Sequence, residues 1–125
     1  MNAVDTNILF YAKDPRDPRK QQIAESTIQS LKKNSVLIWR VAVEYLAVSA
    51  KLEQFGYSRE QAFKDLRLMQ ILWKPILPEW TILDRAEILM NKYNLSSWDA
   101  LIIAACLENG VTTLYTEDIG DFFKK

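Results

Sequence analysis

Four acidic residues stand where carboxylates could act together, although they are far apart along the chain: Asp5, Glu44, Asp99 and Asp118. Asp5 follows the short apolar run of residues 3–4 and precedes Thr6 and Asn7. Asp, Thr and Asn start helices, because their side-chain oxygens accept the free N–H bonds of the first turn. We therefore place Asp5 at the carboxyl end of a buried strand, where α/β sheets bind ligands. The alternative is that Asp5 only caps a helix.

The other three acids also lie beside apolar runs. Glu44 lies inside the run 41–48, which has no polar helix face before Ser49. A buried carboxylate needs a partner, a proton or a metal ion, and a solvent-facing Glu44 is the alternative. Asp99 falls in the first turn of an expected helix, where an acid is also favoured by the helix dipole, by about 0.3–1 kcal/mol. Asp118 follows an expected strand and could instead cap the residues after it.

Considered together, the acids predict one site. The carboxyl ends of parallel strands meet at one edge of a sheet, so we expect these side chains to gather there. No Lys or Arg adjoins Asp5, Glu44 or Asp99 in the sequence, so we expect no neighbouring cation to neutralise them. Oxygen ligands without His or Cys suit Mg²⁺ or Mn²⁺. The sequence has no histidine, which excludes Ser-His-Asp triads and His-ligated zinc.

Short strands and helices that alternate along the chain must position these acids. Strands are expected at residues 3–4, 36–38, 74–77 and 113–115. Helices are expected at residues 6–12, 18–33, 41–55, 58–72, 78–94 and 97–109, with Gly56 and Gly110 ending two of them. This alternation predicts an α/β fold with a parallel sheet and helices on both faces. The length of 125 residues suits one domain.

Composition restricts the function further. Lys plus Arg and Asp plus Glu are equal at 16 each, so nucleic-acid binding would have to use local patches. The one cysteine, Cys106, lies in an apolar run and is expected to be a small core residue. No signal peptide and no apolar run of about 18 residues is present, which favours the cytoplasm and no membrane partner.

These motifs, in this order, resemble the PIN-domain ribonucleases of the VapC toxin type. The matching pieces are residues 4–9, Glu44 in its apolar helix, residues 97–105 and residues 114–118. The resemblance implies a three-layer α/β/α fold with a short parallel sheet, in one domain over residues 1–125. It makes Asp5, Glu44, Asp99 and Asp118 the catalytic, metal-binding acids, with Glu117 or Asp121 as alternatives for the fourth. The implied supporting polar residues are Thr6, Asn7, Thr116 and Glu117.

The resemblance also implies a function and partners. The function is cleavage of RNA with Mg²⁺ or Mn²⁺, whose bound water would replace the missing histidine. The partners are a second copy of the chain, as a homodimer, and an antitoxin protein. RNA would be held by scattered cations, each alternatively an ordinary surface charge: Lys13, Arg16, Arg19, Lys20, Arg59, Lys64 and Arg67. Two other functions stay open: a PIN fold used only for binding, and a receiver-like phosphoacceptor domain. A receiver-like domain would need two adjacent acids near the first strand and a lysine after the last strand, and both features are missing.

Overall fold

The computed structural model describes residues 1–31 and 33–117. Its strands are three residues long and pair in parallel, β1 with β4 and β2 with β3. They are β1 (Asn2–Val4), β2 (Val36–Ile38), β3 (Lys74–Ile76) and β4 (Thr113–Tyr115). A parallel bridge between Asn2 and Ser35 joins β1 to β2, which gives the spatial order β4-β1-β2-β3. All strands of this sheet therefore end at the same edge.

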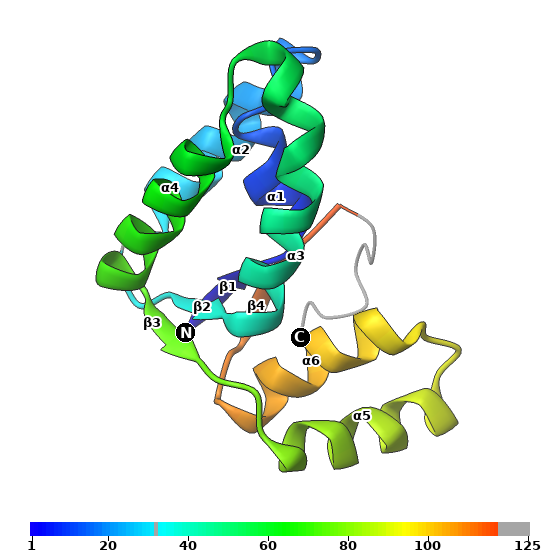
Figure 1. Ribbon diagram of the computed structural model, residues 1–125. Coiled ribbons are helices and arrows are strands. Elements are labelled where there is room, and N and C mark those ends of the chain that lie inside the picture. Colours follow the sequence, from blue (N-terminus) through cyan, green and yellow to red (C-terminus); the bar gives the residue numbers. More distant parts are fainter. Residues whose placement is uncertain (32, 118–125) are drawn as a thin grey trace.

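The helices cover both sides of the strands (Figure 1). They are α1 (Thr6–Tyr11), α2 (Pro18–Ser30), α3 (Trp39–Ser49), the 3₁₀ helix η1 (Ala50–Phe55), α4 (Arg59–Leu72), α5 (Trp80–Lys92) and α6 (Ser97–Glu108). Helices α1 to α4 lie on one side of the strands, and α5 and α6 on the other. α1 packs against α2 and α3, and α5 packs against α6. This arrangement confirms the predicted α/β class with parallel strands between helical layers.

Local side chains explain where several helices begin. Asp17, Ser58 and Ser96 each accept a hydrogen bond from the backbone N–H three residues later, at 3.0 to 3.1 Å. Gly56 ends η1 with φ of 91°, a left-handed conformation that costs glycine little. These are the start and stop signals that can be read from the sequence.

Three predicted helix boundaries are wrong. The helix predicted over 41–55 begins at Trp39 and changes to a 3₁₀ helix at Ala50. The helix predicted over 18–33 ends at Ser30, because Asn34 adopts a positive φ of 57° that turns the chain into β2. The helix predicted from residue 78 begins at Trp80, because Glu79 is extended.

The core lies between the strands and both helical layers. It includes fully buried Val41, Tyr45, Ile103 and Cys106. Burial, with a smaller effect of the Asp5 charge, raises the pKa of the Cys106 thiol to about 12. Cys106 is therefore a core residue that stays protonated at neutral pH, as the sequence predicted. Across the described ranges, no helix is both long and apolar enough to cross a membrane.

Candidate active site

Asp5 is held at the carboxyl end of β1 by the end of β4 and by the first residue of α1. Its backbone N–H donates to the carbonyl of Tyr115, the last residue of β4, at 2.9 Å. Its Oδ1 accepts the backbone N–H of Thr6 at 2.6 Å, and its Oδ2 accepts the hydroxyl of Thr116 at 2.9 Å. Asp5 is only 6 % exposed. Asp5 therefore caps α1, which is the alternative role considered from the sequence, and it is also fixed at the sheet edge.

The pKa of Asp5 is raised above its ordinary value. Burial is the largest cause, and the negative charges of Glu44 and Asp99 add to it. The hydrogen bonds from Thr6 and Thr116 act in the opposite direction and only partly offset these effects. Acids of α3 and α6 therefore act electrostatically on the acid that follows β1. We call Asp5, Glu44 and Asp99 the acidic edge.

Glu44 reaches the acidic edge through Thr6. The Thr6 hydroxyl donates to Glu44 Oε1 at 2.6 Å, while the Thr6 backbone N–H donates to Asp5. The Glu44 side chain is 32 % exposed, so it lies at the mouth of the site. Thr6 is itself buried and connects the two carboxylates. The structure therefore places Glu44 beside Asp5 and away from the outer face of α3.

A cation does lie beside Glu44, and the expectation of none is wrong. Arg40 Nη1 is 3.9 Å from Glu44 Oε1. The two residues are four apart in α3, so they share a helix face even though they do not adjoin in sequence. The Arg40 guanidinium also lies over the ring of Trp98, 4.1 Å from its centroid. Arg40 and Trp98 are the site residues that the sequence reading missed.

The remaining predicted acids differ in position. Asp99 is half-buried in the first turn of α6, where its backbone N–H donates to Ser96 at 3.1 Å. Glu117 is exposed and accepts hydrogen bonds from Tyr11 and Lys20, so its carboxylate is engaged there. Asp118 and Asp121 lie outside the described residues.

The residue types of the acidic edge fit a hard divalent cation, because all are carboxylates. Within residues 1–31 and 33–117, however, no three Asp, Glu or Cys side chains come close enough together to hold a metal ion. What the structure does show is a buried Asp5 whose pKa is raised by burial and, in addition, by repulsion from the charges of Glu44 and Asp99. A bound cation would relieve that repulsion.

Most of the predicted RNA-binding cations near α1 are engaged with acids. Arg16 makes two hydrogen bonds with Asp14, at 2.8 and 2.9 Å. Lys20 lies 3.5 Å from Glu117 and above the Tyr11 ring. Lys13 lies 3.7 Å from Asp65. The others are exposed on α2 and α4: Arg19, Arg59, Lys64 and Arg67. Among the described residues, none of these seven is one of the groups that shift the pKa of Asp5.

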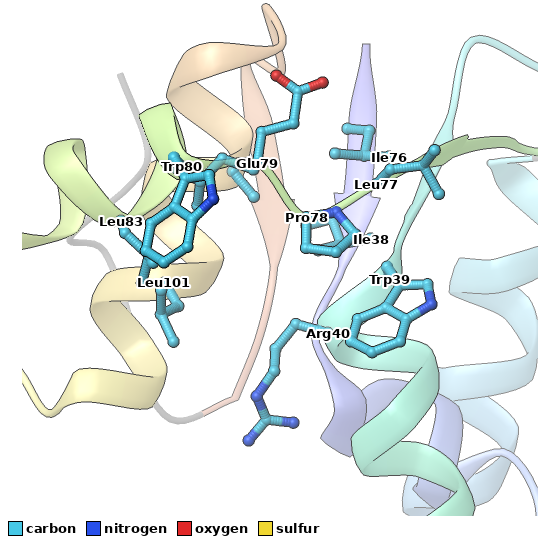
Figure 2. A pocket seen from close by; sticks show the side chains of 12 residues that line it. Ile38, Trp39, Arg40, Ile76, Leu77, Pro78, Glu79, Trp80, Leu83 and Leu101 are labelled. Atoms are coloured by element: carbon cyan, nitrogen blue, oxygen red, sulfur yellow. The ribbon is translucent and has the colours of Figure 1, made fainter.

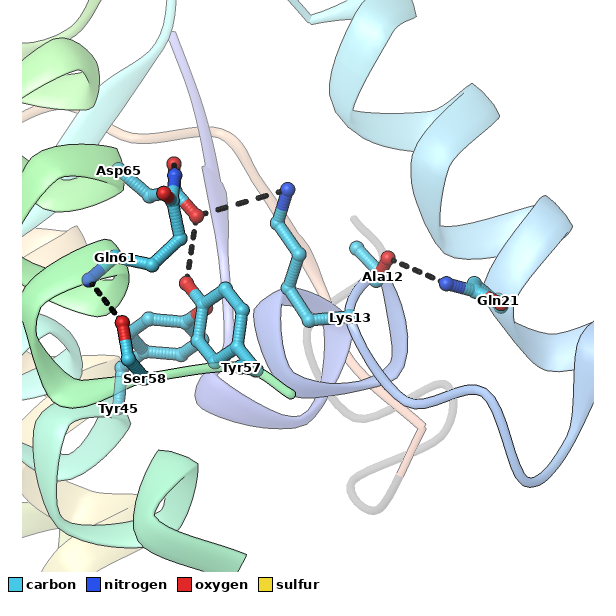
Figure 3. A network of polar contacts seen from close by, with 8 residues as sticks. All are labelled: Ala12, Lys13, Gln21, Tyr45, Tyr57, Ser58, Gln61 and Asp65. Atoms are coloured by element: carbon cyan, nitrogen blue, oxygen red, sulfur yellow. Dashed lines mark hydrogen bonds and ion pairs between the residues drawn. The ribbon is translucent and has the colours of Figure 1, made fainter. Parts of the chain in front are cut away.

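A second polar cluster, which we call the tyrosine cluster, lies between α1, α3 and α4 (Figure 3). The hydroxyls of Tyr45 and Tyr57 are hydrogen bonded, and Tyr57 donates to Asp65 Oδ2 at 2.6 Å. Gln61 donates to the other oxygen of Asp65 at 3.0 Å. Burial raises the pKa of Tyr45 to about 12, and that of Tyr57 further. These residues were not singled out from the sequence.

An apolar groove of about 360 Å³ opens between the start of α3 and α5 (Figure 2). Trp39 and Trp80 stand on opposite sides of it, with Pro78 between them. Arg40 also lines the groove, so the groove adjoins the acidic edge.

The profile of the PIN domain family matches residues 3–125. The chain therefore belongs to the PIN domain family, which confirms the resemblance and rules out a receiver-like domain. A search among curated proteins finds no match.

Solved structures show the same fold. One is a toxin–antitoxin complex from Klebsiella pneumoniae, with TM-score 0.73, 20 % identity, and coverage of 98 % of this chain and 90 % of that one. A second is the toxin VapC20 of Mycobacterium tuberculosis, described as cleaving the sarcin–ricin loop, with TM-score 0.71, 16 % identity, and coverage of 98 % and 92 %. A third is VapBC2 of Rickettsia felis bound to promoter DNA, with TM-score 0.68, 19 % identity, and coverage of 97 % and 90 %.

Proposed function

We propose that this PIN domain is a metal-dependent endoribonuclease, the toxin component of a type II toxin–antitoxin system that acts in the cytoplasm. The observation that carries the proposal is the buried Asp5, whose pKa is raised by burial and by the charges of Glu44 and Asp99. Buried acids with perturbed pKa values at a strand end are typical of functional sites. The family match supports the same chemistry.

The proposed ligands of Mg²⁺ or Mn²⁺ are Asp5, Asp99 and Glu44, with Asp118 as the fourth. Such an ion supplies a water of lowered pKa and screens the phosphate charge. Thr6 and Thr116 orient the Asp5 oxygens, and Thr6 also orients Glu44. Asn7, on the same short helix, and Glu117 complete the polar surroundings that we propose.

The proposal includes a cognate antitoxin and a homodimer. The structural neighbours include a toxin–antitoxin complex and VapBC2, both of this fold. On this chain, large apolar side chains are exposed around the apolar groove: Trp39 (49 %), Leu77 (62 %) and Trp80 (80 %). Such a patch suits a protein partner better than water.

One observation favours a second candidate, a PIN fold that binds RNA or protein without cleaving. The described residues bring no three metal-ligating side chains together. This candidate predicts RNA binding with no metal-dependent cleavage.

The test is to incubate the purified protein with total RNA, in Mg²⁺ or Mn²⁺ and in EDTA. Asp5→Asn is the site variant, and Asp65→Asn is the matched control in the tyrosine cluster. We expect cleavage by wild type and Asp65→Asn with metal, and none by Asp5→Asn or in EDTA. Cleavage that persists in EDTA or in Asp5→Asn, after repurification, would contradict the proposal.

A further inference from the structure

We propose that Arg40 binds a backbone phosphate of the RNA substrate beside the acidic edge, with Trp98 as its support. This inference rests on the proposed nuclease function. It assigns a substrate contact to a residue outside the motifs that led to the acids.

The charge of the acidic edge creates the need for such a residue. Asp5, Glu44 and Asp99 place negative charge where a negatively charged phosphate must arrive, and like charges repel. Among the described residues, one Lys or Arg forms an ion pair with these carboxylates: Arg40, which pairs with Glu44. A phosphate that approaches Glu44 therefore meets Arg40 as a favourable charge.

The geometry of Arg40 leaves donors for that phosphate. The Nη1–Oε1 distance of 3.9 Å to Glu44 is too long for a hydrogen bond. Oε1 of Glu44 already accepts the Thr6 hydroxyl at 2.6 Å. Nε of Arg40 is buried and has no hydrogen-bond partner among the described residues. Because Nε is buried, a phosphate would meet the Nη groups, which the ion pair with Glu44 does not occupy with a hydrogen bond.

Trp98 holds the guanidinium without using those donors. A guanidinium stacked on an aromatic ring is fixed in its plane, and its N–H edges remain free. Trp98 immediately precedes Asp99, so this contact joins the start of α3 to the first turn of α6. Figure 2 shows the Arg40 side chain projecting beside the open apolar groove, and the side chain is 23 % exposed. A substrate phosphate can therefore reach it from solvent.

The test measures RNA binding without cleavage. Asp5→Asn in EDTA is the parent protein, and the probe is a fluorescein-labelled mixed-sequence pool of single-stranded RNA, followed by anisotropy at several KCl concentrations. We expect Arg40→Gln in this parent to weaken binding about tenfold, as loss of a charge-assisted contact would. We also expect the slope of log Kd against log[KCl] to fall by about 0.7, the value for one phosphate on a single strand.

Two further variants make the test specific. Arg40→Lys keeps the charge but loses the planar stack, so it should keep the salt slope with weaker binding than the parent. Arg85→Gln is the matched control, because Arg85 pairs with Glu108 at 2.7 Å between α5 and α6. It should bind RNA like the parent. Circular dichroism establishes whether each variant is folded. If Arg40→Gln is unfolded, the binding of Arg40→Lys decides the test.

The inference is overturned if Arg40→Gln binds like the parent, or if it binds more weakly with an unchanged salt slope. The second result would mean that Arg40 only shapes the site. If Arg40→Gln is unfolded, an Arg40→Lys variant that binds as tightly as its parent overturns it. If wild type cleaves RNA when the inference about Arg40 is overturned, the nuclease proposal stays intact. Arg40-dependent binding with no cleavage by wild type would remove the nuclease proposal and keep the phosphate contact.

Discussion

The acidic edge and the tyrosine cluster both place an aspartate among polar groups, but they treat its charge in opposite ways. Asp65 accepts hydrogen bonds from Tyr57 and Gln61 and lies 3.7 Å from Lys13. Asp5 also accepts two hydrogen bonds, yet the charges of Glu44 and Asp99 add to the rise in its pKa. The tyrosine cluster surrounds Asp65 with hydrogen-bond donors, whereas the acidic edge places other acids around Asp5.

This difference separates a structural role from a functional one. A carboxylate surrounded by donors ties elements together, and here it connects α1, α3 and α4. Acids collected around a buried carboxylate cost stability, and Arg40 offsets this cost only beside Glu44.

Nuclease activity should depend on the acidic edge and not on the tyrosine cluster. Asp5→Asn and Asp99→Asn should lower the rate of RNA cleavage about a thousandfold, because a lost metal ligand removes several kcal/mol of transition-state stabilisation. Asp65→Asn should retain the wild-type rate at a temperature where it is folded. The rates are measured with one RNA substrate in Mn²⁺. Equal rates for Asp5→Asn and Asp65→Asn would remove the functional distinction.

Divalent metal should stabilise the protein through the acidic edge. Mn²⁺ at a hundred times its Kd should raise the free energy of unfolding by about 2.7 kcal/mol, since only the folded chain assembles the ligands. The gain should survive in Asp65→Asn and shrink in Asp5→Asn. Melting curves in EDTA and in Mn²⁺ measure it. An equal shift in both variants would place the metal elsewhere.

Stability without metal should depend on the tyrosine cluster. Asp65→Asn should lower the free energy of unfolding by about 1–2 kcal/mol in EDTA, because it weakens charge-assisted hydrogen bonds in a side chain that is 20 % exposed. Urea unfolding of wild type and variant measures this. No loss of stability would show that Asp65 is not a structural acid.

Tyr57→Phe should have the smallest effect. It removes the hydroxyl that links Tyr45 to Asp65 and should cost about 1 kcal/mol, with no effect on RNA cleavage. The same urea titration and cleavage assay measure both quantities. A loss of cleavage in folded Tyr57→Phe would mean that the two regions are coupled.

Much of the fold and the position of Asp5 could be predicted from the sequence because the signals are local. A short apolar run followed by helix-starting residues identifies both the end of β1 and the start of α1. Ser58, Ser96 and Gly56 mark helix ends in the same local way. The boundaries that were wrong depend on backbone conformations, such as the positive φ of Asn34, that no residue type alone dictates.

The missed residues depend on spacing and on contacts across the chain. Arg40 lies one helical turn before Glu44, so the two charges meet on one helix face although they are not adjacent in sequence. Its stacking on Trp98 and the approach of Tyr57 to Asp65 arise only when helices pack. Lys13, Arg16 and Lys20 look free in the sequence, but each finds an acid in the fold.

The most direct test of the raised pKa of Asp5 at the acidic edge is the pH dependence of unfolding in EDTA. Because the pKa of Asp5 is raised on folding, its contribution to stability is present below its unfolded value of about 4 and is lost as pH rises through the folded value. Asn caps helices as well as Asp does, so Asp5→Asn removes the charge and keeps the cap.

Wild type and Asp5→Asn should therefore be compared by urea unfolding from acidic to neutral pH. We predict that the variant gains on wild type as pH rises and is at least as stable at neutral pH. A variant that is less stable than wild type, by an amount that does not change with pH, would contradict the raised pKa of Asp5 at the acidic edge.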